Sequence, residues 1–83
     1  MGYHIKEITK GELGELSKVN EELQEALDAE EQKNPVMVLL ELSDILGAVD
    51  SYLQKHYDGK LTLKDLVVMA KATQRAFQSG ERK

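Results

Sequence analysis

The stretch between Asn34 and Val49 limits the folds open to this chain, because it carries only two charged residues, Glu41 and Asp44. Its apolar residues recur at helical spacing, and the resulting helix is apolar nearly all round. Such a helix must be covered on both faces. Its main stripe consists of Leu39, Leu42, Leu46, Val49 and Leu53, with Val38 and Ile45 alongside.

Local signals place the ends of this helix. Asn34 is a good N-cap, and Pro35 suits the first helical position because no helical hydrogen bond needs its missing N–H. Gly59 suits the left-handed residue that follows a helix end. The sequence therefore predicts a helix over residues 35–56 that begins directly after a sharp break in the chain.

Two further helices are indicated by capping boxes, in which two side chains satisfy the first free N–H groups of a helix. Thr9 with Glu12 predicts one start, which places Gly11 inside the first turns, and Thr62 with Asp65 predicts the other. The chain is thus expected to be all-α, with helices over residues 10–32, 35–56 and from 62 to about 78, and with Gly80 after the last.

The first of these helices has an apolar stripe with steps of three and four residues. At about 100° per residue, Glu22 lies near the edge of that stripe and Glu25 lies well round to the other side. The acids are therefore expected not to face the same core as the leucines, and an acidic face turned to solvent is the plain alternative. The stripe consists of Leu13, Leu16, Val19, Leu23 and Leu27.

Four acids stand in two pairs of equal spacing, Glu22 with Glu25 and Glu41 with Asp44. A spacing of three puts both members of a pair on one side of a helix. If the second helix folds back along the first, four carboxylates can meet at one point and hold a hard divalent cation. The alternative for the second pair is that both acids look into water at a seam between helices.

The remaining composition excludes several kinds of protein. The 83 residues include no cysteine, so neither disulfides nor zinc–thiolate sites are available to a chain whose monomer would be marginal. A net charge of −4 argues against binding a nucleic-acid polymer. Without an N-terminal apolar run or a membrane-length segment, we expect a cytoplasmic protein that does not engage a membrane. His4 and His56 are interpreted as surface histidines.

The acid pairs carry a family resemblance. EELQE at 21–25, fifteen further residues, and then ELSD at 41–44 resemble the EExxE…ExxD pattern of the MazG-like all-α nucleoside triphosphate pyrophosphohydrolases. The similarity covers about residues 11–77. On this basis residues 1–83 are interpreted as a single MazG-like helical domain, with residues 1–8 as an N-terminal arm.

The resemblance implies a magnesium site and an activity. By motif position, Glu22, Glu25, Glu41 and Asp44 would bind Mg²⁺, and Glu21 would stand behind these ligands or help to orient water in catalysis. Members of the family hydrolyse nucleoside triphosphates between the α- and β-phosphates, giving a monophosphate and pyrophosphate. They assemble as homodimers or homotetramers, with the site in a helical bundle.

Three other residues are predicted to contact the substrate. Lys71 and Arg75 lie on the basic last helix and would meet phosphate oxygens, and Tyr52 would line the pocket. The chain departs from the family in being short and in having Ser43 where many members have glycine. Its last helix also lacks a clear match to the downstream family motifs.

The sequence therefore favours two functions. The first is a Mg²⁺-dependent nucleoside triphosphate pyrophosphohydrolase, built as a four-helix-type bundle through homo-oligomerisation. The second is a non-catalytic acidic helical protein that serves in oligomerisation or interaction, and whose apolar middle helix is only a seam between chains.

Overall fold

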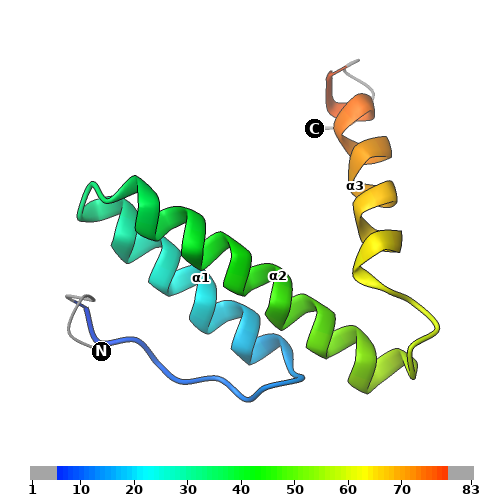
Figure 1. The fold of residues 1–83 in the computed structure, drawn as a ribbon, viewed down its shortest axis with the longest axis horizontal. Helices are drawn as coiled ribbons and strands as arrows, with labels where there is room; N and C mark the ends of the chain where they lie inside the picture. Colours follow the sequence, from blue (N-terminus) through cyan, green and yellow to red (C-terminus); the bar gives the residue numbers. More distant parts are fainter. Residues whose placement is uncertain (1–5, 79–83) are drawn as a thin grey trace.

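The computed structural model describes residues 6–78, and this part of the chain contains three helices and no strand. Helix α1 spans Leu16–Glu31, α2 spans Pro35–Tyr57 and α3 spans Leu63–Gln78. Helices α1 and α2 lie side by side and antiparallel, forming a hairpin (Figure 1). The all-α fold class is thereby confirmed.

The start of α2 is built as the sequence predicts. The side-chain oxygen of Asn34 accepts a hydrogen bond of 3.1 Å from the backbone N–H of Met37. At the other end Gly59 has a φ of 74°, and Asp58 before it is also left-handed, with a φ of 50°. The long middle helix is therefore fixed at both ends by local chemistry.

The capping box that starts α3 is also confirmed. The N–H of Thr62 donates to the Asp65 carboxylate at 2.9 Å, and the N–H of Asp65 donates to the Thr62 hydroxyl at 3.3 Å. Among the described helices, α3 contacts α2 but not α1, and it stands away from the hairpin (Figure 1). The glycine expected after this helix, Gly80, lies outside the described residues. Within residues 6–78, no helix has both the length and the apolar character needed to cross a bilayer.

The predicted start of the first helix is wrong. Helix α1 begins at Leu16 rather than near residue 10, and Thr9 is not its N-cap. Gly14 has a φ of 90°, which interrupts a right-handed helix and which glycine adopts without strain. The hydroxyl of Ser17 accepts the N–H of Glu12 at 3.0 Å. Residues 6–13 therefore form a non-helical segment, and of the predicted arm over residues 1–8 only 6–8 are described.

Gly11 is required by close packing against the start of α1. A Cβ added at Gly11 would lie 2.1 Å from the carbonyl oxygen of Ser17, and backbone cannot move aside as a flexible side chain can. We expect Gly11→Ala to lower the free energy of unfolding by about 2 kcal/mol or more. Gly47→Ala is the control, because a Cβ there meets nothing within 4 Å and alanine favours a helix by roughly 1 kcal/mol. Denaturant unfolding measures both, and equal stabilities would contradict the packing.

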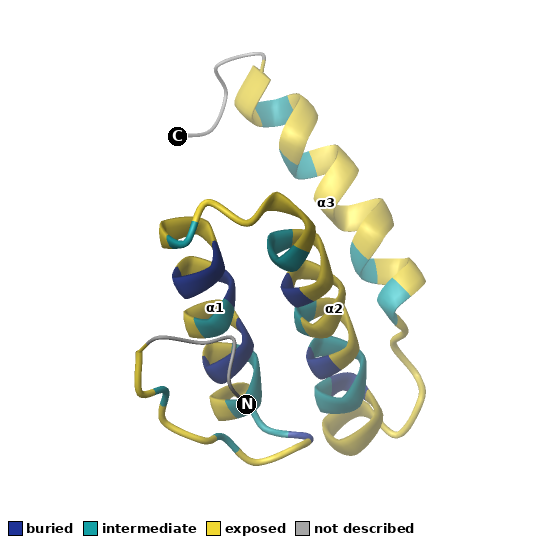
Figure 2. Cartoon of the chain, turned by 60° about the vertical axis from the view of Figure 1, so that its left-hand side comes forward, coloured by how far each residue is buried: buried dark blue, intermediate teal, exposed yellow. Residues whose placement is uncertain are grey.

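The described part of the chain buries very little apolar surface by itself. Figure 2 shows buried positions on α1, on α2 and in the loop just before α1, whereas α3 has none. Among residues 6–78, the buried hydrophobic residues are Ala26, Ala29, Ala48 and Leu53. Most of the predicted stripes are exposed instead, and the exposed members on the hairpin include Leu16, Leu23, Leu27, Leu39, Leu42 and Leu46.

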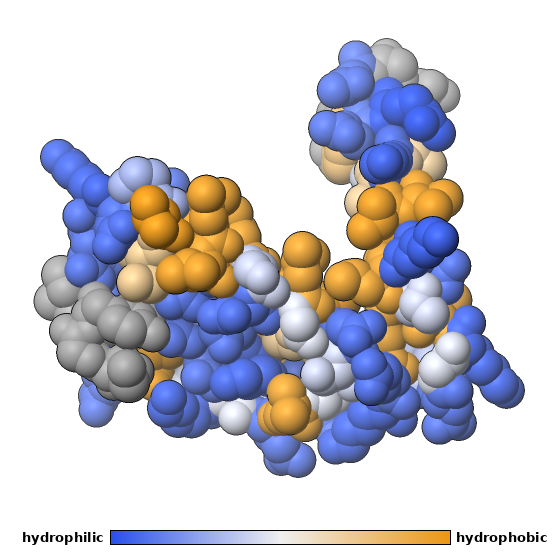
Figure 3. Space-filling model, in the orientation of Figure 1, coloured by the Kyte–Doolittle hydropathy of each residue, from blue (hydrophilic) through white to orange (hydrophobic). Residues whose placement is uncertain are grey.

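These exposed leucines fall on one side of the hairpin. Glu22 and Glu41 mark the two faces that meet, and in each helix the next residue, Leu23 or Leu42, is turned by about 100°. In an antiparallel pair, the same rotation from the shared interface leads to the same side. Hydrophobic side chains also gather at the tip of the hairpin and in the hollow between α2 and α3 (Figure 3). A single chain therefore leaves a broad apolar surface in water.

Candidate metal centre

The two halves of the acidic motif meet across the hairpin. Carboxylate oxygens of Glu22 on α1 and of Glu41 and Asp44 on α2 lie within 4.8 Å of one another. Glu22 and Glu41 are buried, with 7% and 3% of their surfaces exposed, whereas Asp44 is exposed. The cluster thus has a buried side and an open side.

A second cluster shares one of these acids. Carboxylate oxygens of Glu21, Glu22 and Glu25 also lie within 4.8 Å of one another, and Glu25 is half-buried. Glu22 belongs to both clusters and therefore joins the acids of α1 to those of α2. All four predicted metal ligands are in this way brought to one region of the hairpin.

Small residues allow this arrangement. Ala26, Ala29 and Ala48 are buried where α1 faces α2, and their small side chains leave room between the two helices for carboxylates. Glu22 and Glu41 lie on the same helix faces as these alanines. The alternative of a solvated acidic face is therefore wrong for Glu22 and Glu41, although Asp44 does look into water.

Burial and crowding change the charge of Glu22. Desolvation raises the pKa of its carboxyl to about 7, aided by a hydrogen bond with Glu25 and by the negative charges of Glu25 and Asp44. Lys18 acts in the opposite direction, since its ammonium nitrogen lies 3.5 Å from a Glu22 oxygen. Near neutral pH and without metal, Glu22 is therefore protonated in a large share of the molecules.

This shift has a consequence for stability. A carboxyl whose pKa is raised by folding stabilises the fold at pH values below its unfolded pKa, and that contribution is lost as the pH rises through about 7. Glu22 faces Lys18 and Glu25 from its own helix, and Glu41 and Asp44 from α2.

We expect Glu22→Gln, which stays neutral, to gain melting temperature relative to the unmodified chain between about pH 5 and about pH 8 in the presence of a chelator. Thermal melts across this range measure the difference between the two proteins. A difference that does not change with pH would show that Glu22 ionises normally in the folded chain.

Glu21, the predicted catalytic acid, has three partners. The N–H of Gly11 donates to its carboxylate at 2.8 Å, and the ammonium groups of Lys18 and Lys10 lie at 3.2 and 3.6 Å. The Gly11 hydrogen bond, followed by Lys18, holds the pKa of Glu21 below its usual range. Glu21 is therefore charged and is hydrogen-bonded to the segment before α1. Only 3% of its surface is exposed.

The predicted substrate residues lie apart from these clusters within one chain. Lys71 and Arg75 are exposed on α3, a helix that contacts α2 but not α1. Tyr52 is half-buried on α2 and stacks on His56, with ring centroids 4.4 Å apart. The structure therefore brings together the predicted metal ligands and not the predicted phosphate contacts.

Lys18 was missed by the sequence reasoning. It precedes Glu21 by three residues and Glu22 by four, and it forms ion pairs with both. That spacing is a known signal for ion pairs on a helix and could have identified it. Among the ion pairs of the described residues, the pair between Lys18 and Glu22 is the one that joins a lysine to a predicted metal ligand.

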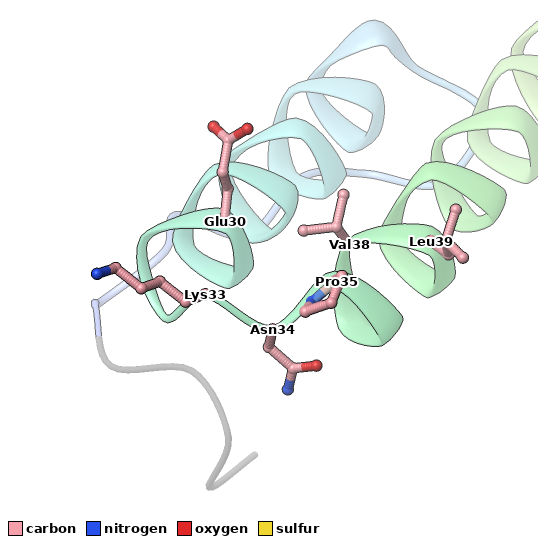
Figure 4. A pocket seen from close by; sticks show the side chains of 6 residues that line it. All are labelled: Glu30, Lys33, Asn34, Pro35, Val38 and Leu39. Atoms are coloured by element: carbon pink, nitrogen blue, oxygen red, sulfur yellow. The ribbon is translucent and has the colours of Figure 1, made fainter.

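A pocket of about 600 Å³ lies at the tip of the hairpin (Figure 4), and none of its lining residues belongs to either acidic cluster. The charged ends of Glu30 and Lys33 point away from it in this view, and its remaining lining is largely apolar. A surface without convergent polar groups does not resemble a catalytic pocket. Its lining residues are Glu30, Lys33, Asn34, Pro35, Val38 and Leu39.

Comparisons of this chain with protein-family models, with curated proteins and with solved structures found no match.

Proposed function

We propose that the protein is a Mg²⁺-dependent nucleoside triphosphate pyrophosphohydrolase of the MazG-like type, acting in the cytoplasm. The observation that carries this proposal is the meeting of Glu22, Glu41 and Asp44 across two helices, with oxygens within 4.8 Å. The EExxE and ExxD halves of the motif are far apart in the sequence and form one cluster only after folding. A chance pair of acidic stretches would not be expected to face each other between buried alanines.

The donor set fits the proposed ion. Carboxylate oxygens are hard ligands, and an octahedral Mg²⁺ with oxygens at about 2.1 Å keeps neighbouring ligands roughly 3 Å apart and opposite ones roughly 4 Å apart. The observed spread of up to 4.8 Å needs only a small contraction. Glu22, Glu25, Glu41 and Asp44 would hold the metal, and Glu21 would stand behind them.

The residues of the chain would position the cation and the substrate and would supply the negative charge that binds the cation. When bound, Mg²⁺ supplies charge screening of the triphosphate, polarisation of the α-phosphoryl group and a lowered pKa of an attacking water. The buried carboxylates of Glu22 and Glu41 would hold the cation, and the exposed Asp44 would leave its open side accessible to the substrate phosphates. Catalysis by positioning and electrostatic stabilisation needs no protein nucleophile.

We also propose that the active form is a homodimer or homotetramer in which two hairpins complete a four-helix-type bundle. The apolar side of the hairpin supports this assembly, because the four buried hydrophobic residues found within residues 6–78 give a single chain little to hold its fold. We expect light scattering at micromolar concentration to give at least twice the mass of one chain. A compact monomer would contradict the assembly.

The exposed apolar side also favours a second candidate, a non-catalytic acidic protein that only oligomerises or interacts. Incubation of a panel of nucleoside triphosphates with the protein and Mg²⁺, followed by product analysis, separates the two functions. The enzyme should release pyrophosphate and a monophosphate, and chelation should stop the reaction. Absence of products from the whole panel would favour the second candidate, and release of orthophosphate would indicate a different bond.

A further inference from the structure

Lys18 lies where the acids of the metal centre meet the segment before α1. Its ammonium nitrogen is 3.2 Å from Glu21 and 3.5 Å from Glu22, and 27% of its side chain is exposed. It is thus a partly buried cation that bridges one proposed metal ligand and one acid behind the ligands. None of the substrate contacts expected from the sequence includes it.

Glu21 fixes the position of this cation. The carboxylate is itself held by the N–H of Gly11 at 2.8 Å, and Gly11 packs so closely on α1 that no larger residue fits. Glu21 is 3% exposed, so its orientation is set by these partners and not by solvent. The segment before α1 therefore determines, through Glu21, where the ammonium group of Lys18 is held.

A divalent cation on Glu22 would change the balance around Lys18. The metal neutralises Glu22 and repels the ammonium group, which then keeps Glu21 as its remaining anionic partner. An ammonium group held beside a metal that binds phosphate is placed to contact the same phosphate chain. Lys71 and Arg75 have no comparable position within the chain, because α3 does not contact α1.

We propose that Lys18 binds phosphate oxygens of the substrate beside the metal, and that Glu21 is the positioning residue that holds it there. This inference rests on the proposed function. It assigns a direct phosphate contact to α1, and it gives Glu21 the task of orienting Lys18 in place of orienting water.

The two effects of Lys18 have opposite signs, which makes the inference testable. Removing its charge should strengthen binding of a metal alone, because a competing cation leaves Glu22, and should weaken binding of a phosphate anion. We expect Lys18→Gln to bind Mn²⁺ about threefold to tenfold more tightly. The same variant should bind inorganic pyrophosphate in the presence of Mg²⁺ about tenfold to a hundredfold more weakly. A purely structural role would weaken both.

Titration calorimetry with MnCl₂, and then with pyrophosphate and Mg²⁺, measures both constants. Lys10→Gln is the control, because this exposed lysine reaches Glu21 but forms no ion pair with Glu22, and both constants should stay unchanged. Lys18→Arg, which keeps the charge, should retain pyrophosphate binding within a few-fold. Circular dichroism verifies the fold of each variant.

Glu21→Gln tests the positioning role separately. Its amide oxygen can still accept the Gly11 N–H, but it no longer holds Lys18 by charge, so KM for the triphosphate should rise while kcat changes little. A fall in kcat at unchanged KM would overturn the positioning role. Unchanged pyrophosphate binding by Lys18→Gln, with normal metal binding by the unmodified chain, would overturn this inference alone. Failure of the unmodified chain to bind Mn²⁺ would overturn the proposed function as well.

Discussion

Glu41→Gln and Asp44→Asn should each reduce pyrophosphate release by about a hundredfold or more while leaving the helices intact. Each substitution keeps the shape of the side chain and removes a charge that the divalent cation needs. Glu41 supplies a buried carboxylate that is 3% exposed, and Asp44 supplies an exposed one on the same cluster. Steady-state rates with saturating Mg²⁺ and triphosphate measure the loss.

A matched control lies on the same helix. Asp50→Asn makes the same chemical change six residues after Asp44, where the carboxylate accepts a hydrogen bond of 2.8 Å from Gln54 and belongs to neither acidic cluster. This variant should keep nearly all activity. Near-normal turnover by Glu41→Gln or Asp44→Asn would remove that residue from the site, and equal losses in all three variants would indicate general damage to α2.

Local signals in the sequence predicted the second and third helices well. Asn34 and Pro35 start α2, and Thr62 with Asp65 starts α3, because these caps depend only on neighbouring residues. The Thr9 capping box failed because the backbone has a positive φ at Gly14, which interrupts a helix, and because Gly11 packs against α1. That packing is a contact between segments, which no local pattern of the sequence displays.

The candidate site was predicted from the spacing of its acids and the break between two helices. Their pairing across the hairpin follows from both, so Glu22, Glu41 and Asp44 were found together. Lys71 and Arg75 could not be placed, because the direction of α3 depends on packing beyond the motif. The oligomer likewise stays a prediction, supported by leucines that one chain leaves exposed.

Magnesium should stabilise the folded protein strongly. In the metal-free site Glu22 is crowded by Glu25 and Asp44, and its pKa is raised by burial first, then by the hydrogen bond with Glu25 and by the charges of both neighbours. A cation that binds only the folded site relieves this repulsion and stabilises the fold by about 2.7 kcal/mol at a hundred times its dissociation constant. For a domain of this size, that corresponds to a rise of roughly 10–20 °C in melting temperature.

Asp44→Asn should separate the metal effect from the fold. Without metal, this variant removes one of the charges that crowd Glu22, so its stability should be equal to that of the unmodified chain or higher by about 1 kcal/mol. With metal it lacks one ligand and should gain little. In chelator, Asp44→Asn should therefore be as stable as the unmodified chain or more stable. In Mg²⁺ it should be less stable than the unmodified chain.

The most direct test of the shared metal site is a melting series on the unmodified chain and on Asp44→Asn, first in chelator and then in increasing Mg²⁺. The four-acid site predicts that the melting temperature of the unmodified chain rises with Mg²⁺ concentration and that Asp44→Asn loses most of this rise. If Mg²⁺ shifts both proteins equally, or shifts neither, Glu22, Glu25, Glu41 and Asp44 do not form a shared metal site, and the proposed pyrophosphohydrolase is contradicted.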